Sequence, residues 1–467
     1  MNTNNIELAR VDRLIDELMP HMTQHLCELI AFPSVREEPR PRQPFGRPIG
    51  EALDYCLRLC EQSGLATTNV DGYAGFADIS GSSDDYVAVL SHVDVVPATP
   101  EEWRHHPYQP VIEQGRIYGR GAIDDKGPLI ASLFAGIALR ECGMRPNKTL
   151  RFIFGCDEES DFACVRHYVK HYPQPVCGFT PDGFFPLVIG EKGNLIYRLS
   201  ALLPEEEQLS AAPRLTALTA GNASNSVPAQ AEATFIESVQ PLPTLSLPAG
   251  VTLSRQEQRL TIRATGVAAH ASMPQQGKNA ILLLLEALFA LDYQPRALKH
   301  SLDRLYCLLG GNGHAACAAF SGADELSSLT HVPSLLNAGE RSFALTCDIR
   351  FPVSHDCARY QRQLDELARA EGWDIEYLMA IEPLYRAADD PLAATLLRAY
   401  RDICGGDTAP LIVGSGTYAK ELHNTLAFGP SFIDAPFLAH HADEYISSAD
   451  LQRLCKIYAR AIYELVK

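Results

Sequence analysis

The sequence predicts an α/β protein in which a doubly wound, mostly parallel sheet is interrupted by an inserted α+β domain. Three observations support this fold class. Short apolar runs alternate with helical patterns through residues 1–193. Residues 194–382 instead alternate polar and apolar side chains, as antiparallel strands do. Helical patterns return over residues 383–467, so we expect the first domain to be discontinuous.

Continuous apolar runs mark the strands of the first domain. Tyr86–Leu90 and Leu150–Phe154 lack polar interruptions, as expected for strands covered on both faces. A third short strand is expected before Thr180. Between these runs apolar residues recur at helical spacing, and Gly or Pro follows several of the patterns. We expect helices at residues 8–29, 51–63, 129–142 and 161–172, with a loop over 36–48.

The inserted region and the last part of the chain show their own patterns. Leu260–Ala264 and Phe343–Arg350 alternate in polarity, which favours antiparallel strands with one face in a core. A helix at Asn279–Leu291 is expected to pack on them. The last part contains the Gly-rich turn Gly414-Ser415-Gly416 and two further helical patterns. These cover residues 392–403 and 449–465.

Composition is typical of a folded globular protein. A chain of 467 residues is too long for one ordinary core, so two or three domains are expected. Its 46% hydrophobic and 21% charged residues argue against disorder. The net charge of -17 argues against nucleic-acid partners, because phosphate contacts require clustered Lys and Arg. Bound cations would offset part of this charge.

The sequence predicts neither a membrane protein nor a secreted one. Met1–Glu7 is polar and lacks the features of a signal peptide. The most apolar run, Ala280–Leu291, is interrupted by Glu286 and is too short to span a bilayer. The 13 cysteines are odd in number and lie in apolar contexts, as reduced core residues do. We therefore expect a cytoplasmic location and no membrane partner.

Five motifs rich in acidic residues and histidine carry the chemistry. Each of the first four follows a stretch that resembles a buried strand, and open parallel sheets bind ligands beyond the carboxyl ends of their strands. Imidazole and carboxylate groups are suitable ligands for divalent cations. The motifs are Ser91-His92-Val93-Asp94, Asp124-Asp125-Lys126-Gly127, Asp157-Glu158-Glu159-Ser160, Pro181-Asp182-Gly183 and His440-His441-Ala442-Asp443-Glu444.

Spacing within the motifs suggests separate roles. Asp94 lies two residues from His92, so both point to the same side of an extended chain, and its carboxylate could accept the second ring N–H of a metal-bound histidine. Glu158 and Glu159 diverge, so one could hold a metal while the other faces a water. In Asp124-Asp125, one carboxylate could bridge two metals while the other caps the following helix.

Each motif also has an ordinary structural explanation when taken alone, such as a solvated acidic turn, a helix cap or a surface loop. Their combination favours a two-metal hydrolytic centre. Three ligands for each metal, with one carboxylate shared, leave an open position for a hydroxide. No His-Glu-x-x-His motif occurs, which excludes a thermolysin-like metalloprotease, and no Gly-x-Ser-x-Gly is completed at Gly414-Ser415-Gly416.

The five ordered motifs resemble those of the co-catalytic zinc metallopeptidase family that contains carboxypeptidase G, aminoacylase, acetylornithine deacetylase and the PepV-type dipeptidases. The resemblance covers essentially the whole chain. It implies that Glu158 is the general base, that Asp94 orients His92, and that two divalent ions share a hydroxide. The ligands it implies are His92, Asp182 and Asp124 for one ion, and Glu159, His440 and the same Asp124 for the other.

The length of the inserted region resembles the enlarged lid of the PepV-type dipeptidases, which implies a monomer. Three local matches support this branch. His270, in Ala268-Ala269-His270-Ala271-Ser272-Met273-Pro274, resembles a lid histidine that stabilises the oxyanion, and Arg350 resembles an arginine that holds the substrate carboxylate. Asn225 resembles a substrate-contacting asparagine, and the resemblance suggests that the backbone around Gly416 lines the substrate pocket. Structural roles for His270 and Arg350 remain the alternative.

The resemblance therefore predicts a dipeptidase that acts on dipeptides with a free C-terminal carboxylate. The alternative is an N-acyl-amino-acid deacylase or carboxypeptidase with the same metal centre. A non-catalytic metal- or peptide-binding module is the remaining possibility from another class. The expected cofactors are two divalent ions, Zn²⁺ first, although Mn²⁺ and Co²⁺ accept the same ligands. The expected partner is a small peptide substrate.

Overall fold

The computed structural model describes residues 7–205, 212–237, 247–310, 326–406 and 409–467, and every structural statement below refers to these ranges. The polar start of the chain lies outside them as far as residue 6. The chain divides into two compact units. Unit 1 comprises Met1–Gly190, Arg386–Leu411 and Thr417–Lys467, and unit 2 comprises Glu191–Tyr385 and Ile412–Gly416.

The division differs from the sequence-based domains in one segment. The chain passes between the units at residues 190 and 385, close to the expected boundaries at 193 and 382. The segment Ile412–Gly416, which we expected in the first domain, groups with unit 2. A backbone hydrogen bond contributes to this grouping, because the N–H of Lys192 donates to the carbonyl of Val413 at 2.9 Å.

Unit 1 is built on a mixed sheet whose strands lie in the order β1-β2-β6-β3-β7-β21-β8. The strands β6, β3, β7 and β21 are parallel to one another, and antiparallel pairing begins at β2 on one side and β8 on the other. The strand bounds are β1 Ala66–Val70, β2 Ala74–Ile79, β3 Ser83–His92, β6 Lys148–Gly155, β7 Cys177–Thr180, β8 Val188–Glu191 and β21 Thr425–Ala427.

Helices cover both faces of this sheet. Phe152 and Phe179 share one face through their register with Val89 of β3, and Gly136 of α3 and Tyr458 of α9 pack on them. Phe76 lies on the opposite face and contacts Tyr168 of α4 edge-on. The helices of unit 1 are α1 Leu8–Ile30, α2 Arg47–Gln62, α3 Lys126–Glu141, α4 Ala163–His171, α8 Pro391–Cys404 and α9 Ser448–Leu465.

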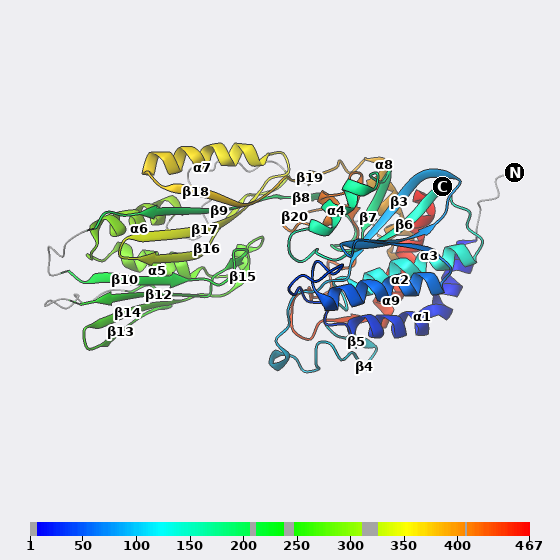
Figure 1. Cartoon of the computed structure of the whole chain (residues 1–467), viewed down its shortest axis with the longest axis horizontal. Coiled ribbons are helices and arrows are strands. Elements are labelled where there is room, and N and C mark those ends of the chain that lie inside the picture. The colour runs from blue at the N-terminus through cyan, green and yellow to red at the C-terminus, as the bar shows by residue number, and fades with distance from the viewer. Residues whose placement is uncertain (1–6, 206–211, 238–246, 311–325, 407–408) are drawn as a thin grey trace. The chain divides into compact units, whose positions relative to one another are not determined.

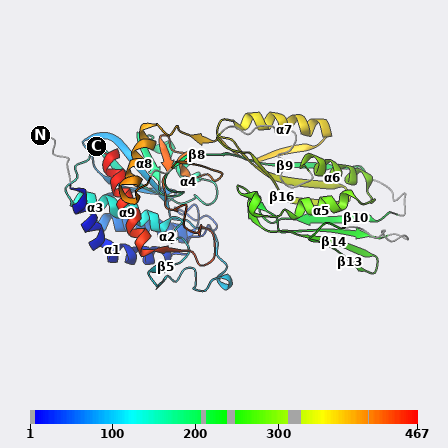
Figure 2. The same cartoon turned by 180° about the vertical axis from the view of Figure 1, so that it is seen from behind.

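The doubly wound α/β prediction is therefore confirmed. Helix α9 lies between α1 and α8, as Figure 2 shows from behind, and also packs on α3. Helix α2 begins at Arg47 and not at residue 51 as expected, because Pro48 suits the first helical turn and does not end the preceding loop. A separate three-stranded sheet, β22-β5-β4, completes unit 1, with β4 at Val111–Glu113, β5 at Arg116–Tyr118 and β22 at Tyr445–Ser447.

Unit 2 is an antiparallel sheet in the order β13-β14-β12-β10-β16-β17-β9-β18, with helices packed on it (Figure 1). Helix α5 packs on β14 and β12, α6 packs on α5, and α7 packs on β18 and β9. A core of apolar side chains such as Leu284, Phe235 and Leu345 fills the space between sheet and helices. The expected inserted α+β domain has this architecture.

The bounds of these elements are β9 Gly193–Leu202, β10 Arg214–Ala220, β12 Gln230–Ile236, β13 Val251–Gln256, β14 Arg259–Thr265, β16 Thr330–Gly339, β17 Ser342–Phe351, β18 Asp374–Ile381, α5 Ala280–Phe289, α6 Arg296–Leu308 and α7 Cys357–Glu371. Short strands occur at β11 Ser226–Val227, β15 Ala269–His270, β19 Leu384–Tyr385 and β20 Leu411–Val413. Among the described helices, none combines the length and the apolar character needed to cross a bilayer.

Candidate metal centre

Three neighbouring parallel strands bring three of the motifs to one edge of the unit 1 sheet. Strand β3 lies between β6 and β7, and His92 at its end pairs in register with Gly155 at the end of β6. The chain beyond β6 supplies Asp157, Glu158 and Glu159, and the chain beyond β7 supplies Asp182. This is the carboxyl-end placement that the sequence predicts for these motifs.

Asp124 reaches the same place by a different route. It precedes α3 and follows β5, a partly exposed strand of the small three-stranded sheet, so the expectation that this motif follows a buried strand is wrong. The same small sheet brings in the fifth motif, because β22 pairs with β5 and Tyr445 lies opposite Tyr118. His440 lies five residues before Tyr445 in the chain. The pairing of β22 with β5 therefore places His440 near the loop that contains Asp124.

A buried carboxylate, Glu444, holds these two loops together. Its oxygens accept hydrogen bonds from the backbone N–H groups of Gly121 (3.1 Å), Ile123 (2.8 Å) and Asp124 (3.3 Å). The Arg120 guanidinium donates a fourth, at 2.7 Å, and both side chains are buried. A carboxylate with this many donors fixes the backbone that carries Asp124.

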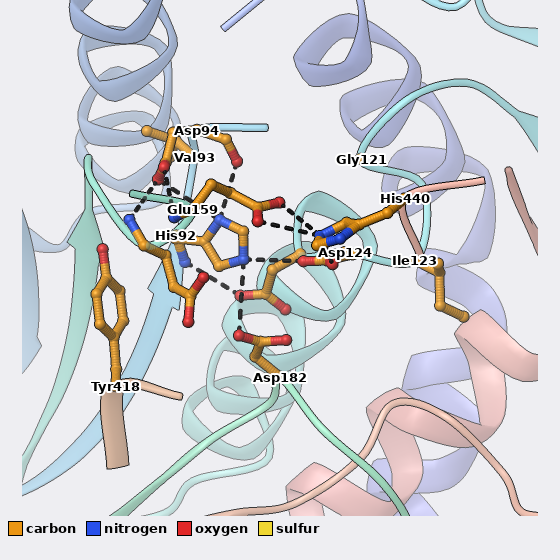
Figure 3. A network of polar contacts seen from close by, with 12 residues as sticks. His92, Val93, Asp94, Gly121, Ile123, Asp124, Glu159, Asp182, Tyr418 and His440 are labelled. Carbon is orange, nitrogen blue, oxygen red and sulfur yellow. Dashed lines mark hydrogen bonds and ion pairs between the residues drawn. The ribbon is translucent and has the colours of Figure 1, made fainter. Parts of the chain in front are cut away.

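Asp124 lies between the two histidines, as Figure 3 shows. One of its oxygens is 3.0 Å from His92 Nε2, and the other is 3.1 Å from His440 Nε2. His440 Nε2 is also 3.0 Å from the Glu159 carboxylate, and His92 Nε2 is 3.8 Å from the Asp182 carboxylate. The structure therefore brings together all five residues that the sequence suggests as metal ligands.

Asp94 supports the centre in a different way from the one expected. The Nδ1 of His92 lies 2.9 Å from the backbone carbonyl of Asp94 and 3.5 Å from its carboxylate, so the closer acceptor for the ring N–H is the carbonyl. The Asp94 carboxylate accepts the backbone N–H groups of Glu158 (3.1 Å) and Glu159 (3.0 Å). Asp94 thus orients His92 mainly through its main chain, and its side chain fixes the acidic pair.

Asp125 does not cap helix α3 with its side chain. It occupies the position before the helix, but its carboxylate makes no capping hydrogen bond. One oxygen accepts the backbone N–H of His92 at 3.1 Å, and the other is buried without a partner. The suggested capping role is therefore wrong, and this carboxylate instead binds the His92 N–H at the end of β3.

Tyr418 packs against His92 and the chain that follows β6. Its ring lies edge-on to His92 at 6.3 Å between centroids, and its hydroxyl accepts the backbone N–H of Asp157 at 3.3 Å and contacts the Cys164 sulfur at 2.8 Å. A Cβ at Gly155 would lie 2.4 Å from the Tyr418 hydroxyl oxygen, so only glycine allows this approach.

Burial of several carboxylates at one point changes their acidity. Burial raises the pKa of Asp182 to about 7, and the Asp124 charge adds to the effect. Burial and the Asp182 charge raise the pKa of Glu158 well above its ordinary value, and burial and the Asp124 charge raise that of Glu159. Although burial acts in the opposite direction, hydrogen bonds from His440 and His92 lower the pKa of Asp124.

The two histidines respond to the same excess of negative charge. Burial opposes protonation of His92, but hydrogen bonds to Asp124 and Asp94 outweigh it and hold the pKa well above its ordinary value. For His440, burial is again outweighed, by Glu159 and Asp124, and the pKa rises to about 11. Because the His440 ring is half exposed, solvent screens part of this effect. The centre is short of positive charge.

The donor set fits divalent cations. Two groups of three side chains each offer ligand atoms within 4.8 Å of one another: His92, Asp124 and Glu159, and His92, Glu158 and Asp182. Imidazole nitrogen and carboxylate oxygen are the donors that zinc, manganese and cobalt accept. Glu158 lies close enough to serve as a ligand, so its role as the base stays a prediction.

The residues that the resemblance suggests for substrate binding all belong to unit 2 and gather in one part of it. Strand β11 pairs with β15, so Ser226 lies opposite His270, and the N–H of Ala271 donates to the Asn225 carbonyl at 2.9 Å. His270 is exposed, and its Nδ1 lies 2.6 Å from the Ser272 hydroxyl.

Arg350 and the Gly414–Gly416 segment lie beside this loop. The Thr330 hydroxyl donates to the carbonyl of Ala271, and Thr330 is in register with Arg350 across β16 and β17. Arg350 is buried and makes a bidentate ion pair with Asp348, at 2.8 and 2.9 Å. Its Nη1 donates to the Gly414 carbonyl at 3.2 Å, and Gly414 in turn packs on Ser272. Gly416 is partly buried in the same segment.

Glu444, Arg120 and Tyr418 have roles that the sequence did not predict. The signals were present, since Glu444 ends the fifth motif, Arg120 lies in a Gly-Arg-Gly turn, and Tyr418 follows the Gly-rich turn. What was missing is the position of their partners, which are backbone N–H groups for Glu444 and Tyr418 and the Glu444 carboxylate for Arg120.

Comparison with known proteins places this geometry in a family. The family model described as Peptidase family M20/M25/M40 matches residues 88–464. The chain is 35% identical over 454 residues to a protein of Bacillus subtilis (strain 168) named "Putative dipeptidase YtjP", with 94% of this chain and 96% of the relative covered.

Two solved structures share the fold. The di-peptidase Dug1p from Saccharomyces cerevisiae superposes with a TM-score of 0.59 at 14% identity, covering 98% of this chain and 99% of the other. The YXEP protein of Bacillus subtilis, a dinuclear metal binding peptidase from the M20 family, gives 0.53 at 11% identity, covering 97% and 99%.

The metal-free chain should lose stability as pH rises from about 4 to about 7. A carboxyl whose pKa is raised on folding contributes stability in its protonated form. This contribution is complete below the pKa of the unfolded chain and is lost above the pKa of the folded chain. For Asp182 the folded pKa is about 7. Thermal unfolding of the chelated chain at pH 4 to 8 measures this. Zn²⁺ should raise the midpoint most at pH 8, where the proton of Asp182 no longer competes with the metal.

The variant Asp182→Asn serves as the comparison, because it keeps the size of the side chain and cannot ionise. Its midpoint should fall less steeply with pH than that of the wild type. Parallel pH profiles for the two chains would contradict the assignment.

Proposed function

Since the chain belongs to Peptidase family M20/M25/M40 and is therefore a peptidase, we propose that it is a dipeptidase that requires two divalent cations and cleaves dipeptides with a free C-terminal carboxylate. The observation that carries the proposal is the position of Asp124, whose two oxygens lie 3.0 Å from His92 and 3.1 Å from His440. A carboxylate shared in this way suits two cations. The full-length similarity to the Bacillus subtilis relative supports the dipeptide as substrate.

In this proposal one cation is held by His92, Asp182 and Asp124, and the other by Glu159, His440 and the same Asp124. The dinuclear metal binding described for the YXEP protein supports two ions. We infer Zn²⁺ as the first choice, with Mn²⁺ and Co²⁺ compatible with the same ligands. When bound, such a pair lowers the pKa of a water and polarises the carbonyl of the peptide bond.

Glu158 then acts as the general base. Its backbone N–H is held by the Asp94 carboxylate, and its side chain lies with His92 and Asp182. From there it would take a proton from the attacking water and pass it to the leaving amine, which needs one carboxylate free to change its protonation state. Asp94 fixes the backbone of Glu158 and of the ligand Glu159 together, so base and ligand keep a constant separation.

Arg350 is proposed to bind the C-terminal carboxylate of the substrate. Asp348 occupies the Nε and one Nη2 donor of its guanidinium, and this bidentate pair fixes the plane of the group. The Gly414 carbonyl takes one Nη1 donor, which leaves one N–H on Nη1 and one on Nη2 to bind a carboxylate. His270 is proposed to stabilise the oxyanion, and Asn225 and the backbone of Gly416 to contact the substrate.

We also infer a cytoplasmic location and a monomeric state. Every cysteine that the structure describes is a free thiol, and most are buried, which supports a reducing compartment. The monomer follows from the resemblance of the inserted region alone.

A substrate panel tests the proposed function. The chelated chain is reconstituted with Zn²⁺, Mn²⁺ or Co²⁺ in turn and assayed on dipeptides beside N-acetyl and N-succinyl amino acids and longer peptides. Dipeptides should be cleaved with a kcat/KM at least about tenfold above the others, as the proposed substrate class requires. Preference for N-acyl amino acids would instead establish a deacylase, and preference for longer peptides a carboxypeptidase.

Replacing Glu158 by Gln should lower kcat by about 100- to 10,000-fold, because an amide cannot accept the proton of the attacking water. Both cations should remain bound, since the proposed ligands are intact. Turnover and metal content measured on the same preparation test this. Glu101→Gln, at an exposed glutamate, is the control. Near-normal turnover in Glu158→Gln would contradict the base, and loss of one cation would instead make Glu158 a ligand.

Replacing Arg350 by Ala should lower kcat/KM on free dipeptides by about 10- to 100-fold, the effect of losing charged hydrogen bonds. Dipeptides with a blocked C-terminal amide should be affected far less. Arg350→Lys keeps the positive charge but loses the two parallel N–H donors of the guanidinium, so its kcat/KM on free dipeptides should also fall. Arg259→Ala, at an exposed residue of unit 2, is the control. Equal losses on free and blocked substrates would show a structural role.

A further inference from the structure

Unit 1 carries a second group of metal-ligand side chains that the proposed reaction does not use. Asp71, His167 and His171 offer ligand atoms that lie within 4.8 Å of one another. Asp71 lies in the turn between β1 and β2, and both histidines lie on helix α4, which Figure 1 labels. None of the three is among the residues of the metal centre described above.

The two histidines are placed to act together. Four positions apart on a helix, they lie on the same face, and their ring centroids are 4.5 Å apart. His167 Nε2 is 3.0 Å from a carboxylate oxygen of Asp71. Ligand atoms around a tetrahedral zinc ion, at bond lengths of about 2.0–2.1 Å, lie about 3.3 Å apart. The observed spacing of His167 and Asp71 is close to this value.

Neighbouring groups hold both rings in place. The Nδ1 of His171 donates to the backbone carbonyl of His167 at 2.9 Å, which leaves its Nε2 as the free acceptor of the ring. The ring of His167 stacks on Tyr73 at 4.1 Å between centroids, with 15° between the planes. Metal-binding histidines commonly have their second nitrogen fixed in this way by a carbonyl, which sets the tautomer and the ring orientation.

An ordinary surface ion pair explains these contacts less well. A pair between His167 and Asp71 accounts for two of the three side chains, and it contributes little at an exposed position. It gives no reason for a second imidazole to lie beside the first, where two protonated rings would repel each other. A divalent cation accounts for all three, because it binds neutral imidazoles and offsets the carboxylate.

We propose that Asp71, His167 and His171 bind one divalent transition-metal ion at a surface site of unit 1. Two imidazole nitrogens and one carboxylate oxygen suit Zn²⁺, Ni²⁺ or Cu²⁺ better than Mg²⁺ or Ca²⁺, which prefer all-oxygen sites. The Asp71 carboxylate is largely exposed, so the site is open to ions from solution. A bound ion would link the β1–β2 turn to α4, the helix that follows the acidic pair Glu158 and Glu159 in the chain.

Metal counting on the full-length chain tests the proposal. Wild type and the double variant His167→Ala with His171→Ala are brought to equilibrium with Zn²⁺ over a range of concentrations, and bound zinc per chain is measured. The wild type should bind one ion more than the double variant. A double variant at two other exposed histidines, His21→Ala with His423→Ala, is the matched control, since neither belongs to a ligand group in the described chain.

A milder variant separates ligand loss from misfolding. Asp71 adopts a left-handed conformation with φ of 55°, which Asn also tolerates, so Asp71→Asn keeps the turn and removes only the charge. It should weaken binding of the additional ion at least about tenfold. Circular dichroism and turnover should be unchanged in all these chains, because the three residues lie outside the proposed catalytic machinery.

Two results would overturn the proposal. One is an equal number of zinc ions, with equal affinities, on the wild type and on the His167→Ala, His171→Ala chain. The other is the same loss of binding in the control variant, which would mark non-specific binding to surface histidines. The test counts bound metal and does not measure activity. Its result is therefore independent of whether the substrate proposed above is correct.

Discussion

The metal centre of unit 1 depends on a concentration of buried negative charge that the protein itself neutralises only in part. Asp124, Glu158, Glu159 and Asp182 meet where three parallel strands end, and they face two imidazoles. Burying more carboxylates than positively charged partners is costly, so protons or cations must supply the missing positive charge. Burial raises the pKa of Asp182 to about 7, so a proton supplies part of this charge below that pH in the absence of metal. Two divalent cations remove this need, which links the fold of the centre to its chemistry.

A second constraint is that one ligand must arrive from the far end of the chain. Glu444 provides this by accepting backbone hydrogen bonds from the loop of Asp124, more than 300 residues earlier in the sequence. Burial raises the pKa of Glu444 to about 7, although Arg120 acts in the opposite direction. The fifth motif thus has two functions, because His440 faces the centre while Glu444 fixes the loop opposite. A variant that removed only Glu444 would leave every ligand present and misplace Asp124.

The sequence predicts those features that depend on one local pattern. Strand β3 and helix α9 follow from a continuous apolar run and from helical spacing, and the ligand motifs follow from residue type. Helix α7 was not predicted, although its buried residues Cys357, Tyr360, Leu364 and Ala368 have helical spacing. The hydrogen-bond partners of Asp94 and Asp125 could not be predicted, because they are backbone N–H groups whose positions depend on loops from different strands.

The two groups of ligands in unit 1 differ in ways that bear on which cation each one holds. The central group has more carboxylates than imidazoles and is largely buried, so electrostatic attraction favours any dication of suitable size. The group of Asp71, His167 and His171 has one carboxylate and two imidazoles and is open to solvent, where attraction is screened and the nitrogen donors decide the preference. Mn²⁺, which favours oxygen ligands, would therefore occupy the central group alone, whereas Zn²⁺ would occupy both. Comparing the number of ions bound in Mn²⁺ with the number bound in Zn²⁺ thus distinguishes the two sites on the unmodified protein.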